Sequence, residues 1–294
     1  MAATRKPRYL TGLIGAGISA SRSPYLHEGE ADALGLRLVY SLFDLPGAAA
    51  GDPKLAALLD AAEVLGFSGL NITYPFKQAV LPLLDDLSED ASAIGAVNTV
   101  AFRNGVRIGY NTDVLGFGTS LTRCLAEAAF DTVLQIGAGG AGAATAFALL
   151  RHGVGQLRLY DTDPAKAAAL QATLARRFGA ARVALVDDIP GGTAGANGIV
   201  NATPMGMASH PGTPLPTGLL RSDMWVADIV YFPLETELLA AARAMGCPTM
   251  DGSRMVVYQA AAAFEIFTGI APDAERMLAA FDRDAAIRAA GGRA

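Results

Sequence analysis

The 294-residue chain has few of the residues from which metal sites and disulfide frameworks are built. It contains three histidines and two cysteines, and Cys124 and Cys247 stand alone without CxxC spacing. This spacing argues against a zinc site and against disulfides, so we expect two buried apolar thiols in a reducing compartment. The chain is therefore predicted to be a cytoplasmic protein without a metal.

The chain also lacks an excess or a cluster of positive charge. Lys and Arg total 23 against 28 Asp and Glu, the net charge is −5, and no basic block occurs. Because nucleic acids and anionic membranes attract clustered Lys and Arg, neither is expected as a partner. No apolar run approaches the ~20 residues of a membrane span. The first ten residues lack the apolar stretch of a signal peptide, so none is expected.

Strand and helix patterns alternate through the first part of the chain. Hydrophobic residues make up 52% of the chain, and its length favours about two domains. We expect strands at 9–17, 37–45 and 67–73, and helices at 21–35, 52–66 and 111–130. Gly35 should stop the first helix, Asp52 should cap the second with Pro53 at its first position, and Pro75 should end the third strand. This alternation predicts a parallel sheet covered by helices.

The pattern restarts at Asp131 and predicts a second domain. Residues 132–153 read as strand, glycine turn and helix, followed by a strand at 156–163, a helix at 164–179 and strands at 198–204 and 224–231. The helical segment from 253 onward has no strand to pair with, so it could pack back on the first domain. We predict an α/β fold with a discontinuous substrate domain (1–118, completed by 253–294) and a Rossmann dinucleotide-binding domain (119–252).

The glycine turn "GAGGAG" predicts a dinucleotide site, because it follows a strand and opens an Ala-rich helix. Asp161 lies nineteen residues beyond Gly142, near the ~20 expected of the acid that holds the adenosine ribose. An acid at this position accepts a hydrogen bond from a free 2′-hydroxyl and repels a 2′-phosphate. Because Lys166 is the only basic residue nearby, NAD is favoured over NADP. In the alternative, purely structural interpretation, the glycines only form turns and Asp161 caps a helix. The expected cofactor residues are Gly137, Ala138, Gly139, Gly140, Ala141, Gly142 and Asp161.

A second group of polar residues lies at predicted strand ends and turns of the first domain. Its members, which suit a polyhydroxylated ligand, are Ser21, Ser23, Asn71, Thr73, Lys77, Asn98 and Asp113. The chain has only four lysines against nineteen arginines, so a lysine in this group is notable. If Lys77 and Asp113 are adjacent, Asp113 would hold the ammonium while Lys77 exchanges a proton with a reacting hydroxyl. Singly, these residues could equally be helix caps, turn residues or surface charge.

The motifs together resemble the shikimate dehydrogenase family, and within it the NAD-dependent quinate/shikimate branch. The resemblance runs from about Gly12 to Gly269. It is carried by "SRSPYLHE", "GLNITYPFK", "GAVNTV", "GYNTDVLGF", "GAGGAG", "VNATPMGM", "DIVYFPLETELL" and "GSRMVVYQAAAAFEIFTG".

The resemblance implies a role for each matching residue. The family's serine pair, here Ser21 and Ser23, binds the substrate carboxylate, and Lys77 and Asp113 match its catalytic pair. The resemblance implies that Thr73, Asn98 and Gln259 bind ring hydroxyls of the substrate and that Tyr231 borders the substrate. The remaining cofactor contacts are implied for Asn201, Thr203, Met205, Val230, Gly252 and Met255.

Three departures from the biosynthetic NADP enzymes match the NAD branch. They are His27-Glu28 in place of His-Asn, Asp161-Thr162-Asp163 in place of Asn-Arg-Thr, and Arg254 in place of glycine. In that branch the second serine is often threonine when quinate is a good substrate, so Ser23 favours shikimate with weaker quinate activity. The resemblance implies an NAD-dependent dehydrogenase, and we expect a monomer or a homodimer. The alternatives are a quinate-preferring or aminoshikimate-type dehydrogenase, a non-catalytic sensor that binds NAD and an aromatic-pathway acid, and a scaffold protein.

Overall fold

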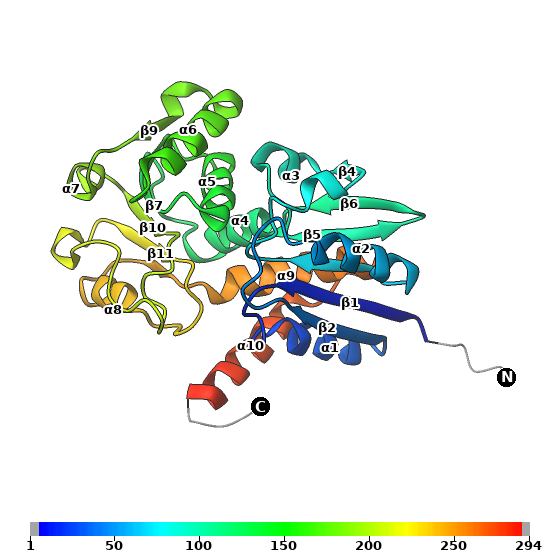
Figure 1. The fold of residues 1–294 in the computed structure, drawn as a ribbon. Helices are drawn as coiled ribbons and strands as arrows, with labels where there is room; N and C mark the ends of the chain where they lie inside the picture. The colour runs from blue at the N-terminus through cyan, green and yellow to red at the C-terminus, as the bar shows by residue number, and fades with distance from the viewer. Residues whose placement is uncertain (1–5, 290–294) are drawn as a thin grey trace. The chain divides into compact units, whose positions relative to one another are not determined.

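The computed structural model describes residues 6–289, and the chain divides into two compact units. Unit 1 comprises residues 1–112 and 259–294, and unit 2 comprises residues 113–258. The outermost residues within the predicted domain limits, 1–5 and 290–294, lie outside the described part. The unit boundaries fall inside two helices, α4 (Thr112–Cys124) and α9 (Ser253–Thr268), both labelled in Figure 1.

Unit 1 is built on a mixed six-stranded sheet of order β2-β1-β3-β5-β6-β4. Strand β1 pairs in parallel with β2 and β3, whereas β5 runs antiparallel to both β3 and β6. The prediction of a purely parallel sheet is therefore wrong here, because β5 and β6 form a hairpin that the sequence reading missed. The elements are β1 (Arg8–Gly15), α1 (Ser23–Ala33), β2 (Arg37–Asp44), α2 (Lys54–Val64), β3 (Gly69–Ile72), η1 (Leu81–Leu83), β4 (Asp86–Leu87), α3 (Glu89–Ile94), β5 (Thr99–Arg103), β6 (Val106–Tyr110) and α10 (Ala274–Ala289).

Local chemistry explains most of these boundaries and corrects two. Gly35, with φ of 70°, follows the end of α1 as predicted. Helix α2 starts one residue later than expected: Pro53 is its N-cap, and the Asp52 carboxylate accepts from Lys54 N at 2.9 Å. Strand β3 spans Gly69–Ile72 and so ends one residue before the expected Thr73, ahead of Pro75.

Two buried carboxylates, one on α1 and one on α10, form ion pairs inside unit 1. The Glu30 carboxylate, fully buried on α1, accepts from Arg276 and from the backbone N–H of Asp273. Arg22, which directly precedes α1, pairs with the buried Asp284 at 3.2 Å. Because a buried charge without its partner is costly, these pairs specify how α10 docks on α1.

Unit 2 contains an all-parallel sheet of order β12-β11-β10-β7-β8-β9, the strand order of a Rossmann fold. The predicted order of strands and helices from 132 to 231 is confirmed, but the strands at 156–163, 198–204 and 224–231 each end three residues earlier than expected. The short strands β9 and β12 and the short helix α7 are additional. The elements are β7 (Thr132–Ile136), α5 (Gly140–His152), β8 (Gln156–Tyr160), α6 (Pro164–Phe178), η2 (Ala180–Arg182), β9 (Val183–Leu185), α7 (Ile189–Thr193), β10 (Gly198–Asn201), η3 (Thr217–Leu219), β11 (Trp225–Asp228), α8 (Glu237–Ala244) and β12 (Thr249–Met250).

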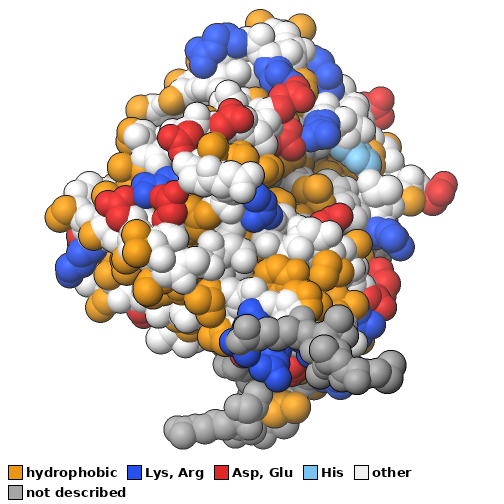
Figure 2. All heavy atoms as spheres, turned by 90° about the vertical axis from the view of Figure 1, so that its right-hand side faces the viewer, with side chains coloured by type: hydrophobic (Ala, Val, Ile, Leu, Met, Phe, Trp, Pro, Cys, Tyr) orange, Lys and Arg blue, Asp and Glu red, His pale blue; other side chains and the backbone are white. Residues whose placement is uncertain are grey.

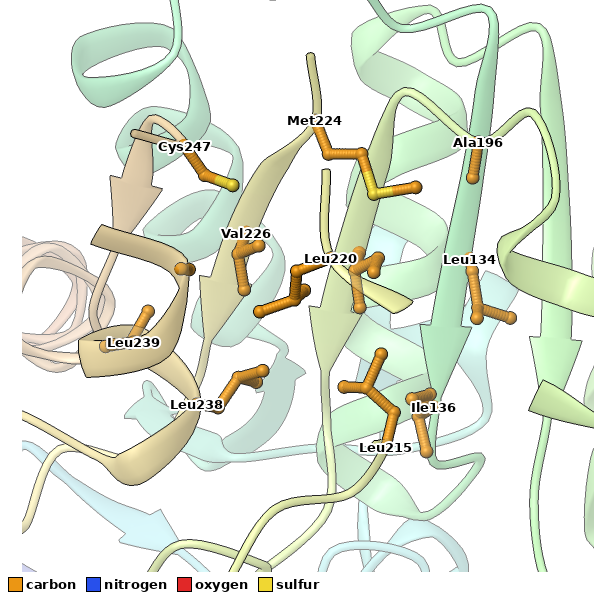
Figure 3. Close-up of a cluster of buried hydrophobic side chains, with 12 residues drawn as sticks. Leu134, Ile136, Ala196, Leu215, Leu220, Met224, Val226, Leu238, Leu239 and Cys247 are labelled. Carbon is orange, nitrogen blue, oxygen red and sulfur yellow. The ribbon is translucent and has the colours of Figure 1, made fainter. Parts of the chain in front are cut away.

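One side of this sheet carries a cluster of buried aliphatic side chains (Figure 3). Leu134 and Ile136 of β7 and Val226 of β11 pack with Leu238 and Leu239 of α8. Strands buried on both faces lack the alternation of a half-exposed strand, which is why these segments appear as continuous apolar runs. Cys247 belongs to this cluster, but Cys124 is only half-buried, so the prediction of two buried thiols is half wrong.

The surface bears charges of both signs without a single-sign block on the face shown in Figure 2. Across the described residues, none of the helices combines the length and the hydrophobicity that a membrane span requires.

Candidate cofactor and substrate sites

The glycine turn of unit 2 is shaped by backbone contacts that exclude side chains. Gly137 has φ of 106°, and a Cβ there would meet the Ala202 carbonyl oxygen at 2.6 Å. A Cβ on Gly142 would meet the Gly137 carbonyl oxygen at 2.4 Å, so α5 can start this close to β7 only with glycine. A Cβ on Gly139 would meet nothing within 4 Å, so its exposed backbone faces open space.

A buried glutamine holds this turn in place. Gln135 Nε2 donates to the carbonyls of Gly137 and Gly142, each at 2.8 Å, and Thr145 Oγ1 donates to Gln135 Oε1 at 2.9 Å. With its carbonyls occupied internally, the turn presents Gly140, Ala141 and the other first-turn N–H groups of the 13-residue helix α5 outward. N–H groups at a helix N-terminus together with an open glycine backbone suit a pyrophosphate.

Asp161 is bonded to the glycine turn and does not cap the next helix. Its Oδ2 accepts from Ala138 N at 2.7 Å, and its Oδ1 accepts from Asp163 N at 2.8 Å. The N-cap of α6 is Asp163, whose side chain accepts from Ala165 N and Lys166 N. The helix-cap alternative is thus wrong for Asp161. Each carboxylate oxygen keeps a lone pair for a ribose hydroxyl, so the residues present fit a dinucleotide.

The loop after β10 is organised by Asn201. Its Oδ1 accepts from Thr203 N and Oγ1 at 3.0 and 2.6 Å, and its Nδ2 donates to the Met205 carbonyl at 2.9 Å. Nδ2 also donates to Oδ1 of buried Asp228 at 2.9 Å. Asn201, Thr203 and Met205 are therefore held together in one compact turn.

Asp228 joins that turn to the loop after β11. Its carboxylate accepts from Val230 N at 3.0 Å and from Thr236 Oγ1 at 2.7 Å, in addition to Asn201. Burial raises the pKa of Asp228 to about 6, even though these three hydrogen bonds lower it. The sequence did not predict a role for Asp228, because an acid at the end of an apolar strand carries no motif that marks it as functional.

The other predicted residues of unit 2 lie on neighbouring segments. Val230 is buried and Tyr231 is exposed. A Cβ on Gly252 would meet the Ile229 and Val230 carbonyl oxygens at 2.4 and 2.7 Å, so glycine is required there. Met255 is buried in the first turn of α9.

In unit 1 the predicted serines bond each other. Ser21 Oγ donates to Ser23 Oγ at 3.2 Å and accepts from Ser23 N at 3.3 Å. The buried Tyr40 bonds the predicted Asn71. Tyr40 Oη donates to Asn71 Oδ1 at 2.7 Å. The N-cap of α1 is Arg22, which has no side-chain capping bond, so neither serine caps the helix.

Two asparagines continue this network toward Gln259. Asn71 Nδ2 donates to the Asn98 carbonyl and to Thr99 Oγ1. Asn98 Oδ1 accepts from Thr112 N at 2.8 Å, and its Nδ2 donates to Gln259 Oε1 at 3.2 Å. Asn71 lies within β3 and is therefore not a turn residue, whereas the buried Asn98 lies in the bend that directly precedes β5.

Backbone pairing connects the predicted catalytic residues to this network. The Lys77 carbonyl accepts from Val97 N at 2.8 Å, next to Asn98 in the chain. Thr112, which Asn98 bonds, directly precedes the buried Asp113. Thr73 precedes the turn that carries Lys77, and its carbonyl accepts from Phe76 N at 2.8 Å. Whether Lys77 and Asp113 act as a pair stays a prediction.

Sequence reasoning missed the residues that hold this network together. They are Tyr40, Thr99 and Thr112, all buried. Tyr40 is the one buried residue of the otherwise partly exposed strand β2. Thr99 directly follows Asn98 in "GAVNTV". Neither residue belongs to a sequence motif whose spacing predicts a binding site. For metals, the described residues contain no group of three or more His, Cys, Asp or Glu side chains arranged to bind one.

Unit 2 is a Rossmann unit with an acid on its glycine turn, which defines a dinucleotide-dependent protein. The same chain carries a network of hydroxyl and amide side chains, which suits a small polar ligand. The model of the shikimate dehydrogenase substrate-binding domain matches residues 13–100, and that of the shikimate 5'-dehydrogenase C-terminal domain matches residues 252–280. The chain belongs to the shikimate dehydrogenase family.

Similar proteins divide between the two nicotinamide cofactors. The chain is 53% identical over 273 residues to shikimate dehydrogenase (NADP(+)) of Streptomyces avermitilis, covering 92% of this chain and 94% of that protein. It is 51% identical over 275 residues to quinate/shikimate dehydrogenase (NAD(+)) of Corynebacterium glutamicum strain R, covering 92% and 97%. The crystallised quinate dehydrogenase of Corynebacterium glutamicum in complex with NAD has a TM-score of 0.90 and 49% identity, covering 95% and 100%.

Proposed function

We propose that this chain is an NAD-dependent dehydrogenase that interconverts shikimate and 3-dehydroshikimate and acts more weakly on quinate. The proposal rests on family membership and on the placement of Asp161. The similar proteins include both NAD and NADP enzymes, so identity alone does not choose the cofactor. The choice depends on the residues of this chain.

The single observation that carries the cofactor proposal is the bond between Asp161 and the glycine turn. The 2.7 Å contact with Ala138 N holds a carboxylate beside the phosphate-binding turn. A 2′-phosphate there would meet a like charge, whereas a 2′-hydroxyl would find an acceptor. The nearby Lys166 is exposed and already lies 3.6 Å from Asp163, so it offers no clear phosphate site.

The chemistry follows from the roles proposed for Lys77 and Asp113. In oxidation, Lys77 takes the proton of the ring hydroxyl, and in reduction it returns that proton to the nascent alkoxide. Asp113 orients Lys77 and bonds a neighbouring hydroxyl. Arginine could not replace Lys77, because a guanidinium does not release its proton. When bound, the nicotinamide supplies the hydride acceptor, and the protein supplies orientation and proton transfer.

The substrate contacts divide along the unit 1 network. We assign the carboxylate to Ser21 and Ser23, and ring hydroxyls to Thr73, Asn98 and Gln259, with Tyr231 bordering the ligand. These groups donate and accept without net charge, which suits a polyol. Ser23, rather than threonine, favours shikimate over quinate. We further propose substrate and cofactor domains with the predicted limits, a cytoplasmic location, and a monomeric or homodimeric state.

Steady-state assays with four substrate and cofactor combinations test this function. We would follow reduced nicotinamide by its absorbance, with shikimate or quinate as substrate and NAD or NADP as cofactor. The expected result is the highest kcat/KM for shikimate with NAD. Faster quinate oxidation would preserve the mechanism and reverse the substrate assignment. Binding of NAD and shikimate without turnover would indicate the sensor instead.

A further inference from the structure

The side-chain amide of Asn98 has one allowed orientation, which the backbone of Thr112 imposes. A backbone N–H can only donate, so the atom of Asn98 that faces Thr112 N at 2.8 Å must be Oδ1. The Thr99 hydroxyl donates to the same oxygen at 3.0 Å. Asn98 is 3% exposed, and a flipped amide would oppose its NH₂ group to the N–H of Thr112. The orientation therefore follows from chemistry.

Asn98 in turn fixes the orientation of Gln259, the last member of the unit 1 network. With Oδ1 on the side of Thr112, Nδ2 is the atom of Asn98 that faces Gln259 at 3.2 Å. Because Nδ2 has only protons to offer, Gln259 must turn its acceptor, Oε1, toward it. Among the described residues Gln259 Nε2 has no hydrogen-bond partner, and it is not one of the buried atoms that lack one. Gln259 is only partly buried, so a ligand can reach Nε2.

The atom of Gln259 that remains for a ligand is thus a donor. A hydroxyl or carbonyl oxygen on a ring carries lone pairs and accepts from Nε2. A protonated amine at the same ring position has N–H bonds and no lone pair, so it would face Nε2 donor to donor. An alkylamine is protonated at neutral pH, because its pKa lies near the ~10.4 of a lysine side chain.

We propose that Asn98 sets Gln259 as a donor that selects an oxygen substituent, and rejects a protonated amine, at the ring position that Gln259 contacts. This inference rests on the proposed function, in which Gln259 binds a ring hydroxyl. Replacing that hydroxyl by an amine leaves two donors unpaired, so we expect about ten- to a hundredfold weaker binding, the usual cost of an unsatisfied polar group. The same selection acts against an aminoshikimate-type substrate whose amine lies at this position.

A set of shikimate analogues, each with one ring hydroxyl replaced by an amine, tests the selection. Calorimetry on the full chain at pH 7 should show one analogue that the wild-type protein binds about ten- to a hundredfold more weakly than shikimate for this reason. Gln259→Glu keeps the shape, accepts from Asn98 Nδ2 with one oxygen and offers a ligand the other. It should restore binding of that analogue about tenfold beyond its effect on the other analogues. The added charge attracts every amine, so only the difference between ring positions reports the contact.

A change at Asn98 tests whether the orientation of Gln259 is imposed from behind. Asn98→Asp keeps an acceptor for Thr112 N and presents a second acceptor to Gln259, which must then turn Nε2 toward it and offer Oε1 to the ligand. The same analogue should gain affinity. This gain should vanish in a double variant with Asn98→Asp and Gln259→Ala, which keeps the charge and lacks the amide. Gln78→Glu, which adds a charge at an exposed position of unit 1, should show no preference among ring positions.

The outcomes separate this inference from the proposed function. An equal change for all analogues in Gln259→Glu, or a wild-type protein that binds every amine as tightly as shikimate, would overturn the selection. If a variant does not fold, the comparison among analogues in the wild-type protein still decides. If wild type binds neither shikimate nor quinate, the function and this inference both fail. If it binds them without a difference between ring positions, only the inference fails.

Discussion

The two candidate sites are built in opposite ways. In unit 2 the glycine turn is a continuous stretch from Gln135 to Gly142, in which close backbone approaches require glycine and the neighbouring Gln135 side chain bonds the turn's carbonyls. In unit 1 the network runs through side chains from widely separated segments, from Tyr40 to Gln259. A site made of backbone leaves a spacing in the sequence, whereas a site made of side chains leaves only scattered polar residues. The comparison also predicts different sensitivities to substitution and to pH.

The largest expected effect lies in unit 1. Lys77→Ala should lower turnover about 10²–10⁴-fold, the usual range for losing a general acid or base, with little change in NAD affinity. Lys54→Ala, which changes an exposed lysine of α2, is the matched control. Near-normal turnover in Lys77→Ala would remove this residue from the mechanism.

Acid should destabilise unit 1 through His27. Burial lowers the pKa of His27 to about 3, whereas in the unfolded chain it protonates near 6.5. Its contribution to stability is therefore complete above pH 6.5 and is lost as the pH falls, by about 2 kcal/mol between pH 7 and pH 5. We would measure the free energy of unfolding at pH 7 and pH 5 by urea denaturation followed by circular dichroism. In His27→Leu the loss between the two pH values should be about 2 kcal/mol smaller than in wild type. His210→Leu, a change on an exposed loop, should show the same loss as wild type.

A smaller effect concerns cofactor choice in unit 2. Asp161→Ala should weaken NAD binding about tenfold and bring the NAD and NADP constants closer together, because an acceptor for the ribose and a repelling charge are both lost. Asp163→Ala removes the cap of α6 and should lower stability by about 1 kcal/mol without changing the cofactor ratio. An unaltered ratio in Asp161→Ala would contradict the assignment of Asp161.

The smallest effect has the opposite sign to that of His27. Burial raises the pKa of Asp228 to about 6, so the folded protein binds this proton more readily than the unfolded chain does. The stability that Asp228 contributes is therefore complete below about pH 4 and is lost as the pH rises through 6. As the pH falls from 7 to 5, protonation of Asp228 should raise the free energy of unfolding by about 1 kcal/mol. Asp228→Asn keeps the shape and should remove this contribution. Fluorescence of Trp225, the only tryptophan in the chain, follows unit 2 specifically.

Much of unit 2 could be predicted, and less of unit 1. The parallel strands from 132 to 231 are continuous apolar runs separated by helices, and this order alone predicts a Rossmann sheet. The hairpin β5–β6 was missed although the sequence carries its local signal: Asn104 and Gly105, with φ of 52° and 77°, form the two-residue turn between the strands. Ser21, Asn71 and Asn98 were selected as polar residues at strand ends and turns, but their partners Tyr40, Thr99 and Thr112 were not.

The sequence by itself determined the order of elements, the glycine turn with Asp161 at its expected distance, and the rare Lys77 among polar neighbours. These features are local, because glycine freedom, strand alternation and helix periodicity act over a few residues. Tertiary structure alone decided that Tyr40 of β2 bonds Asn71 of β3, and that backbone groups at Asn98 and Thr112 orient the network. Hydrogen-bond direction depends on which groups face each other, and residues far apart in the chain meet only after the sheet has formed.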